Sequence, residues 1–351
     1  MKCSTISELL ALALSLRLVS ANSWTLQGMK SLVAFGDSYT DESRLGYFIE
    51  HQEAPPVGWI GPESNSTASG GQSWARYVSQ YTDSELYNYA VSGAVCSNDV
   101  TPRYFESIDA PFPAVEQYEI PAFIADSEYE DPDSGEPALC LPPQHTVYSM
   151  WIGTNDLGND AFMTDSQIEG KSVLDYIECV LQGFDSLFEN GARYFVLMNV
   201  APLHLLPQYS TPERGGVNAT QFWPNKPENI TEISYRMQQT VVTVNEILAL
   251  KVQLAMKDRY QGANVAIFDT SKLLSDIYSN PNEYLNGTEP ANVEGWNNQC
   301  DLEGNNCVPS SSPDSFMWYD ALHPSEQTSR IIAEHFVEVI EGESDYATYF
   351  D

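Results

Sequence analysis

Hydrophobic residues gather in five short runs along the chain, at 31–36 (SLVAFG), 86–91 (LYNYAV), 146–153 (TVYSMWIG), 194–200 (YFVLMNV) and 264–269 (NVAIFD). The runs do not alternate strictly between apolar and polar positions. A continuous apolar run of this length is typical of a strand buried on both faces of a parallel sheet. We therefore expect buried strands at these positions.

Longer segments between these runs repeat their apolar residues every three or four positions, which predicts helices over 172–189, 230–260 and 325–340. Strands that alternate with helices indicate an α/β sandwich. Three long irregular insertions, near 99–143, 201–227 and 276–319, are expected to lie over one edge of the sheet. Loops of that length are usually functional or mobile.

The first residues are typical of a secretory signal peptide. Lys2 gives a positive start, an apolar stretch follows over 9–16, and small residues stand near Ala21. The alternative is an amphipathic N-terminal helix. No later stretch reaches the ~18 apolar residues that a membrane span needs. We therefore expect a signal over 1–21 and a single exported domain over 22–351, with no stable membrane association.

The pattern Asn-x-Ser/Thr, the acceptor for N-glycosylation, occurs at Asn65, Asn218, Asn229 and Asn286. One match can arise by chance because the pattern is short. Four in one chain, all in polar or Gly/Pro/Ser-rich stretches, favour the surface of a secreted glycoprotein.

The cysteines also fit a secreted protein. Cys3 would leave with the signal, so an odd number remains and at least one thiol is free. Cys300 and Cys307 flank a short loop that a disulfide could close. Cys179 lies in an apolar helical pattern and is predicted to be a buried free thiol, which leaves Cys96 and Cys140 as a second pair. None of these cysteines has metal-ligand spacing with histidine, so we expect no metal and no cofactor.

The chain holds 49 acidic and 16 basic residues, a formal net charge of −33. Such a surface repels nucleic acid, anionic lipid headgroups and polyuronates. A neutral substrate and an acidic medium suit it better, although solubility alone would also explain the charge.

Polar residues that could take part in catalysis follow three of the predicted strands. Ligands bind beyond the carboxyl ends of the strands in an open parallel sheet, so these positions matter. Gly36-Asp37-Ser38 follows the first strand and exposes a serine hydroxyl at a turn; Ser92-Gly93 and Thr154-Asn155 follow the second and third. Taken singly, each is also an ordinary cap or turn sequence.

A fourth group stands near the C-terminus, in Asp320-Ala321-Leu322-His323-Pro324. The Asp320 carboxylate, three residues before His323, can accept a hydrogen bond from the ring Nδ1–H. That bond would leave Nε2 free to take a proton from a serine. A lone Asp-x-x-His is more often a surface ion pair. The catalytic interpretation of this pair therefore depends on the other three groups.

The order Ser, Gly, Asn, Asp/His resembles the sequence blocks of the SGNH (GDSL-type) hydrolase superfamily, from Gly36 to His323. Gly-Asp-Ser-Tyr stands where many members have Gly-Asp-Ser-Leu. The sequences NYAVSGAVCSN and WIGTNDLG look like fungal secreted acetylesterases of carbohydrate esterase family 16. The resemblance implies a flavodoxin-like three-layer α/β/α fold with five parallel strands.

It also implies a Ser38–His323–Asp320 triad. The oxyanion would be held by the backbone N–H groups of Ser38 and Gly93 and by the Asn155 amide. The insertions are mostly polar and acidic, which favours acetylated oligosaccharides of the plant cell wall over long-chain lipids. Two alternatives stay open: a lipase or phospholipase with the same triad, and a sugar-binding glycoprotein that has lost catalysis.

Overall fold

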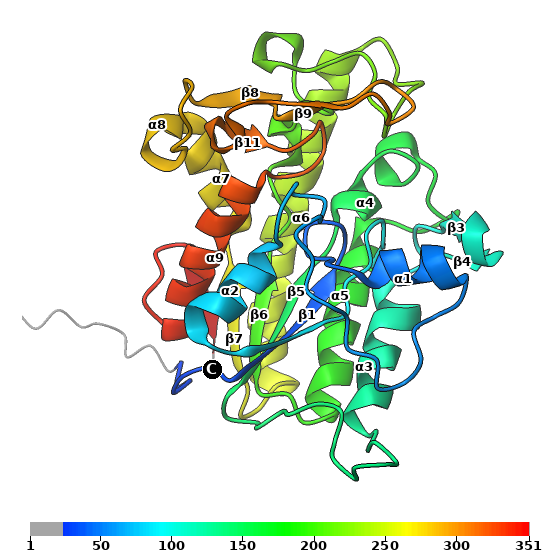
Figure 1. Cartoon of the computed structure of the whole chain (residues 1–351), viewed down its shortest axis with the longest axis vertical. Coiled ribbons are helices and arrows are strands. Elements are labelled where there is room, and N and C mark those ends of the chain that lie inside the picture. Colours follow the sequence, from blue (N-terminus) through cyan, green and yellow to red (C-terminus); the bar gives the residue numbers. More distant parts are fainter. Residues whose placement is uncertain (1–23, 351) are drawn as a thin grey trace, which may run out of the picture.

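Six strands form the central sheet of the computed structural model, which describes residues 24–350 (Figure 1). They lie in the order β12-β7-β6-β5-β1-β2. All neighbouring pairs are parallel except β12 with β7. Their bounds are β1 (Ser31–Gly36), β2 (Glu85–Asn88), β5 (Thr146–Trp151), β6 (Tyr194–Met198), β7 (Asn264–Phe268) and β12 (Ala347–Phe350).

The five parallel strands are those that the sequence predicts, and β1 has the predicted bounds. Numbered among themselves, they follow the flavodoxin-like order 2-1-3-4-5. The other four strands end one to three residues before their predicted ends, and the sheet gains a sixth strand. β2 ends at Asn88, before the predicted end at residue 91. The expected five-stranded sheet also gains β12, an antiparallel edge strand whose few residues are only half-buried.

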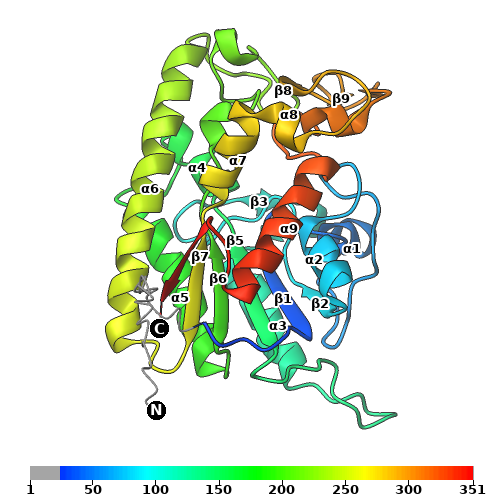
Figure 2. The same ribbon diagram turned by 90° about the vertical axis from the view of Figure 1, so that its left-hand side faces the viewer.

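Helices cover both faces of the sheet, which gives the expected three-layer α/β/α sandwich. Figure 2 shows α5 and α6 on the side of the sheet opposite α2 and α9. The bounds of the helices are α1 (Arg44–His51), α2 (Trp74–Thr82), α3 (Ile120–Ser127), α4 (Thr154–Leu157), α5 (Val173–Glu189), α6 (Ile230–Asp258), α7 (Thr270–Ser279), α8 (Pro281–Tyr284) and α9 (Glu326–Glu341).

The three predicted helices correspond to α5, α6 and α9, and each starts at a capping side chain. The Ser172 hydroxyl accepts a hydrogen bond at the start of α5, Asn229 does so for α6, and Ser325 does so for α9. Such caps satisfy N–H groups that have no partner inside the helix. Ser325 follows Pro324, so α9 begins directly after the Asp320–His323 segment.

Aromatic side chains fill the core between the layers. On one side Trp74 of α2 packs against Phe336 of α9, with ring centroids 4.9 Å apart. On the other side Phe123 of α3 meets Phe35 of β1 and Tyr148 of β5 at 5.7 and 5.6 Å. These contacts fix the sheet between rigid walls, so the loops beyond its strands start from fixed positions.

The prediction that all three insertions lie over one edge of the sheet is wrong. The first contains α3, which packs against α5 as part of a helical layer. The other two lie together beyond the carboxyl ends of the strands (Figure 1). Short strand pairs brace the insertions: β3 (Tyr104–Phe105) with β4 (Ala110–Pro111), β8 (Asn292–Trp296) with β11 (Phe316–Trp318), and β9 (Asn298–Gln299) with β10 (Val308–Pro309).

The structure contains the predicted Cys300–Cys307 disulfide, but the predicted Cys96–Cys140 pair is wrong. Cys96 is bonded to Cys179, and Cys140 is an exposed free thiol. Cys179 faces inward from α5, so it meets the loop that follows β2 at Cys96. Its buried helical position, which suggested an inert thiol, is what makes it available to this partner.

The four glycosylation acceptor asparagines Asn65, Asn218, Asn229 and Asn286 are all exposed. Exposure is required of an acceptor, so all four stay candidates. The predicted signal over 1–21 lies outside the described residues. Within residues 24–350, no helix is long and apolar enough to cross a membrane.

Candidate active site

Ser38 stands on a tight turn that follows β1. Gly36 has φ of +148°, and a Cβ at this position would lie 2.2 Å from the carbonyl oxygen of Trp151 on the neighbouring strand β5. Only glycine fits there. Just beyond it, the buried Asp37 carboxylate accepts the backbone N–H of Tyr39 at 3.0 Å. The turn therefore holds the half-buried Ser38 side chain beyond the sheet edge.

Ser38, His323 and Asp320 form a continuous chain of hydrogen bonds. The His323 Nε2 atom lies 2.8 Å from Ser38 Oγ, and its Nδ1 atom lies 2.9 Å from each oxygen of Asp320. Asp320 also accepts the backbone N–H groups of Leu322 and His323, at 2.8 and 2.9 Å. With the carboxylate fixed in this way, Nδ1 carries the proton and Nε2 faces the serine as an acceptor.

Two aromatic rings hold the imidazole in place. Tyr39 lies edge-on to His323 with centroids 5.8 Å apart, and its hydroxyl donates to the carbonyl oxygen of Leu322 at 2.7 Å. Phe222, from an insertion, meets the ring at 5.3 Å. His323 is only 6% exposed as a result. This packing fixes the orientation of Nε2 toward Ser38.

Gly93 and Asn155 border the same pocket from two other strand ends. Gly93 follows β2 with φ of +94°, and a Cβ there would lie 2.9 Å from the Phe112 ring. Asn155 lies in the short helix α4 after β5, and its Nδ2 donates to the carbonyl oxygen of Ala94 at 2.8 Å. That bond uses one of the two amide protons, so the other remains for a ligand.

Ser38, Gly93, Asn155 and His323 therefore border one pocket of about 360 Å³. Asp320 lies behind His323 and outside this lining. The volume of the pocket lies at the lower end of the range for small-molecule sites. Most of the residues that line it have polar side chains: Ser38, Ala68, Ser92, Gly93, Arg103, Thr154, Asn155, Gly158, Asn159, Asp160, Tyr209, Phe222, Leu322 and His323.

A buried glutamate, which the sequence did not predict, lies beneath the pocket. Glu119 is fully buried and accepts the backbone N–H of Gly36 at 2.9 Å and that of Val91 at 3.2 Å. It thus ties the ends of β1 and β2 together where the Ser38 turn and the Gly93 loop begin. Burial raises the pKa of its carboxyl well above the usual range. Glutamate is rarely buried, so no sequence pattern pointed to this role.

Two aspartates also lie buried below the site. Burial raises the pKa of Asp37 to about 6 and that of Asp156 to about 7. Asp156 accepts the backbone N–H of Cys96 and the Thr101 hydroxyl, both at 3.0 Å. One Asp37 oxygen has no hydrogen-bond partner among the described residues. These carboxyls anchor the loops that carry the pocket, and neither faces the pocket as part of its lining.

Arg103 is a pocket residue that the sequence analysis also missed. Its guanidinium donates to the carbonyl oxygen of Gly93, and burial lowers its pKa. It lies in an insertion, where an isolated arginine carries no signal of its own.

The remaining histidines lie outside this pocket. His145 binds the Gly28 carbonyl oxygen, and His335 pairs with Glu338. Burial lowers the pKa of His204 to about 4. His51 stacks beside Tyr47 on α1. Across residues 24–350, no cluster of three or more His, Cys, Asp or Glu side chains is arranged to hold a metal ion.

Known proteins resemble this chain over most of its length. The family model described as "GDSL-like Lipase/Acylhydrolase" matches residues 32–336. An acetylesterase from Hypocrea jecorina is 39% identical over 92% of each chain. An acetylesterase from Thermothelomyces thermophilus is 26% identical over 89% of each chain.

Among solved structures, the acetylxylan esterase Axe2 from Geobacillus stearothermophilus matches 90% of this chain and 95% of its own, with a TM-score of 0.36 and 14% identity. The sequence matches identify a carboxylic ester hydrolase. The family model and the Hypocrea jecorina acetylesterase both match most of the chain. The chain therefore belongs to the GDSL-like lipase and acylhydrolase family.

Proposed function

We propose that this protein is a secreted serine esterase that removes acetyl and other short acyl groups from plant cell-wall oligosaccharides. One observation carries the proposal: the hydrogen-bonded chain from Asp320 through His323 to Ser38 ends at a small pocket whose lining residues are mostly polar. That geometry suits acyl transfer through a covalent intermediate.

In the first half of the reaction, Ser38 Oγ attacks the ester carbonyl carbon while His323 Nε2 takes the serine proton. The negative charge that develops on the carbonyl oxygen faces the backbone N–H groups of Ser38 and Gly93 and the free Asn155 amide proton. The tetrahedral intermediate then breaks its bond to the alcohol oxygen. His323 returns the proton to that oxygen, and the acyl group stays on Ser38.

The second half repeats these steps with water. His323 removes a proton from the water, whose oxygen attacks the acyl carbon, and the Ser38–acyl bond breaks as His323 protonates Oγ. The Asp320 carboxylate stabilises the imidazolium in both halves. No step uses a metal or a cofactor.

The pocket supports a short acyl group and a polar alcohol. Its volume of about 360 Å³ is small, and asparagine, aspartate, arginine and tyrosine side chains line it. A long acyl chain would need an extended apolar wall. The 39% identity with an acetylesterase supports the same substrate class.

Secretion is supported by independent features. Disulfides join Cys96 to Cys179 and Cys300 to Cys307, and such bonds persist in oxidising compartments. The four glycosylation acceptors are exposed. The first residues have the pattern of a signal peptide.

The decisive test measures acetate release from a panel of acetylated xylo- and manno-oligosaccharides, with Ser38→Ala as the blank. A parallel series of p-nitrophenyl esters from acetate to octanoate reports the acyl preference. We expect turnover of the acetylated sugars and a preference for acetate. A preference for octanoate would favour a lipase, and wild-type protein that neither turns over an ester nor reacts at Ser38 with an organophosphonate would indicate a binding protein.

A further inference from the structure

A second pocket of about 660 Å³ opens beside the catalytic pocket. Helix α1 and the segment 59–68 form most of its walls. Ala68 and Ser92 line both pockets, so the two adjoin. A ligand whose ester lies at Ser38 can therefore extend directly into the second pocket.

An aromatic wall lines this pocket. The Tyr47 ring lies 4.9 Å from Trp59 and 4.1 Å from His51, measured between centroids. The Arg44 guanidinium lies 5.1 Å from the centre of the Trp59 ring and helps to fix the indole. Fixed aromatic rings offer a large contact area at a low cost in conformational entropy. The C–H faces of a sugar ring can pack on such a wall.

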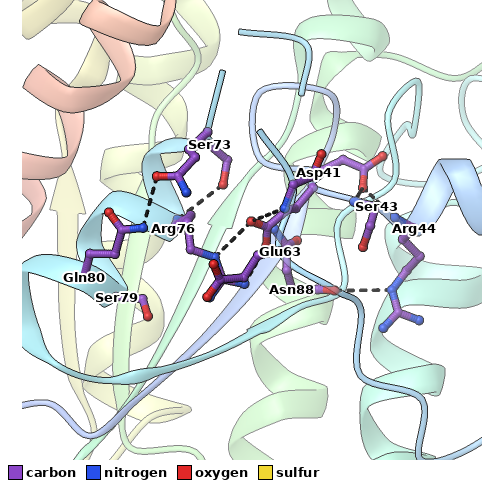
Figure 3. A network of polar contacts seen from close by, with 12 residues as sticks. Asp41, Ser43, Arg44, Glu63, Ser73, Arg76, Ser79, Gln80 and Asn88 are labelled. Carbon is purple, nitrogen blue, oxygen red and sulfur yellow. Dashed lines mark hydrogen bonds and ion pairs between the residues drawn. The ribbon is translucent and has the colours of Figure 1, made fainter. Parts of the chain in front are cut away.

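An ion-pair network holds the segment 59–68, which carries Trp59. Glu42 accepts hydrogen bonds from Arg76 Nε and Nη2, at 2.9 and 2.8 Å, and from the backbone N–H of Ser64 at 3.2 Å. Arg76 Nη1 reaches Glu63 at 3.2 Å (Figure 3). The network ties the segment 59–68 to α2.

Asp41 joins the second pocket to the loop that carries Ser92 and Gly93. Its Oδ1 accepts the backbone N–H groups of Ser43 and Arg44, both at 2.9 Å, and its Oδ2 accepts that of Ser92 at 2.8 Å. The second pocket is therefore built in advance and in fixed register with Gly93. A preformed site binds without the entropic cost of ordering its walls.

Several polar groups of this pocket remain available to a ligand. The Tyr47 hydroxyl, the Trp59 indole N–H and the Glu50 carboxylate make no hydrogen bond to any residue between 24 and 350. They combine donors with an acceptor, as recognition of hydroxyl groups requires. Asp41, Glu42, Glu50 and Glu63 all line the pocket, so an anionic ligand would be repelled.

We propose that the second pocket binds the sugar residues next to the acetylated residue of an oligosaccharide, with Trp59 and Tyr47 as the stacking wall. This proposal rests on the proposed carbohydrate substrate. The enzyme should then gain kcat/KM as the neutral sugar chain grows from one residue to three.

The test compares acetylated mono- and trisaccharides of one sugar type, with kcat/KM measured for wild type, Trp59→Ala and Tyr47→Ala. We expect the trisaccharide-to-monosaccharide ratio to fall about five- to tenfold in each variant, as the loss of one aromatic contact predicts. Trp59→Phe should recover most of the ratio. Tyr235→Ala removes a tyrosine that is 58% exposed on α6 and should keep the wild-type ratio.

The failures of the two proposals differ. If the wild type deacetylates both sugars with equal kcat/KM, or if Trp59→Ala and Tyr47→Ala keep the wild-type ratio, the second pocket is not a sugar site although the substrate class stands. If wild type hydrolyses p-nitrophenyl acetate but no acetylated sugar, both proposals are wrong. Should Trp59→Ala fail to fold, Tyr47→Ala alone decides. All proteins are compared after enzymatic removal of N-glycans, because Asn65 lies in the segment 59–68.

Discussion

At the scale of single residues, the site combines one local pair with one distant partner. Asp320 and His323 are three residues apart, and the turn between them brings carboxylate and ring together. Ser38 lies 285 residues away in sequence. It reaches His323 because β1 ends at the same edge of the sheet as the segment that leads into α9. The local pair is thus visible in the sequence, whereas its contact with Ser38 depends on the fold.

If Ser38 and His323 act as one catalytic unit, replacing either residue should lower kcat by the same large factor. Ser38→Ala and His323→Ala should each lower kcat by about 10⁶, as in hydrolases whose triad members work together. Circular dichroism should show folded protein, because both side chains border the pocket. Rates come from p-nitrophenyl acetate hydrolysis. Near wild-type turnover by either folded variant would remove that residue from the mechanism.

Asn155 allows a finer test of charge stabilisation. Its amide is anchored on the carbonyl oxygen of Ala94, which aims the second proton into the pocket. Asn155→Ala should lower kcat by about 10² to 10³ with little change in KM, since an oxyanion donor acts mainly in the transition state. Steady-state kinetics on one acetyl ester separate the two constants. A change in KM alone would mean that Asn155 positions substrate.

At the scale of elements, the sequence predicts the parts whose pattern is local. Buried parallel strands have continuous apolar runs, and α5, α6 and α9 have regular spacing with capping residues. β12 escaped because an edge strand that is half-buried has no such run. Glu119 and the Cys96–Cys179 bond escaped because each joins elements that are distant in sequence. Only the packed fold determines those partners.

Glu119 provides a test of how β1 and β2 are held at the site. Glu119→Ala removes this acceptor from the Gly36 N–H, whereas the Val91 N–H keeps its bond to the carbonyl oxygen of Gly36. The change should lower the free energy of unfolding by about 1 to 3 kcal/mol. Glu119→Gln keeps one acceptor oxygen and should cost less. Urea unfolding measures both, with the exposed Glu116→Ala as the matched control. Equal stability of Glu119→Ala and Glu116→Ala would contradict this role.

The revised disulfide pattern makes a separate prediction. The Cys96–Cys179 bond links the loop after β2 to α5 across 83 residues. Cys179→Ser should lower the free energy of unfolding by about 2 to 5 kcal/mol, as the loss of a bond that closes a long loop does. Cys140→Ser changes an exposed free thiol and should have little effect. Thermal unfolding of both variants checks the assignment; the reverse order of stabilities would restore Cys140 as a partner.

At the scale of the whole molecule, the acidic net charge and the buried carboxyls both make the folded protein less stable as pH rises. The formal net charge is −33, and repulsion among the carboxylates is strongest when all of them are ionised. Asp37, Asp156 and Glu119 lie buried below the pocket, and burial raises the pKa of each. Both effects favour the folded protein in a mildly acidic medium, which suits the proposed secreted enzyme.

The sign of this pH dependence follows from Asp37, whose pKa rises from 3.8 in the unfolded chain to about 6 in the fold because the carboxyl is buried. Between these values the folded state binds more protons than the unfolded state, so stability falls as pH rises. The contribution is fully present below pH ~4 and is lost above pH ~6, a change on the order of 3 kcal/mol. Asn at this position cannot ionise, and Asp37→Asn should lack that part of the slope.

Urea unfolding at intervals from about pH 4 to 7, the window in which this carboxyl titrates, gives the two slopes. Asp301→Asn is the control: backbone and side-chain N–H groups of Asn305 and Asn306 lower the pKa of this exposed carboxyl. Its contribution therefore rises slightly with pH near pH ~4 and is constant above pH ~5, opposite in sign to that of Asp37. If Asp37→Asn loses stability with pH as steeply as wild type does, burial does not raise the pKa of the Asp37 carboxyl. The loss would then belong to Asp156, to Glu119 or to the surface charge, and Asp156→Asn in the same series separates the first of these from the others.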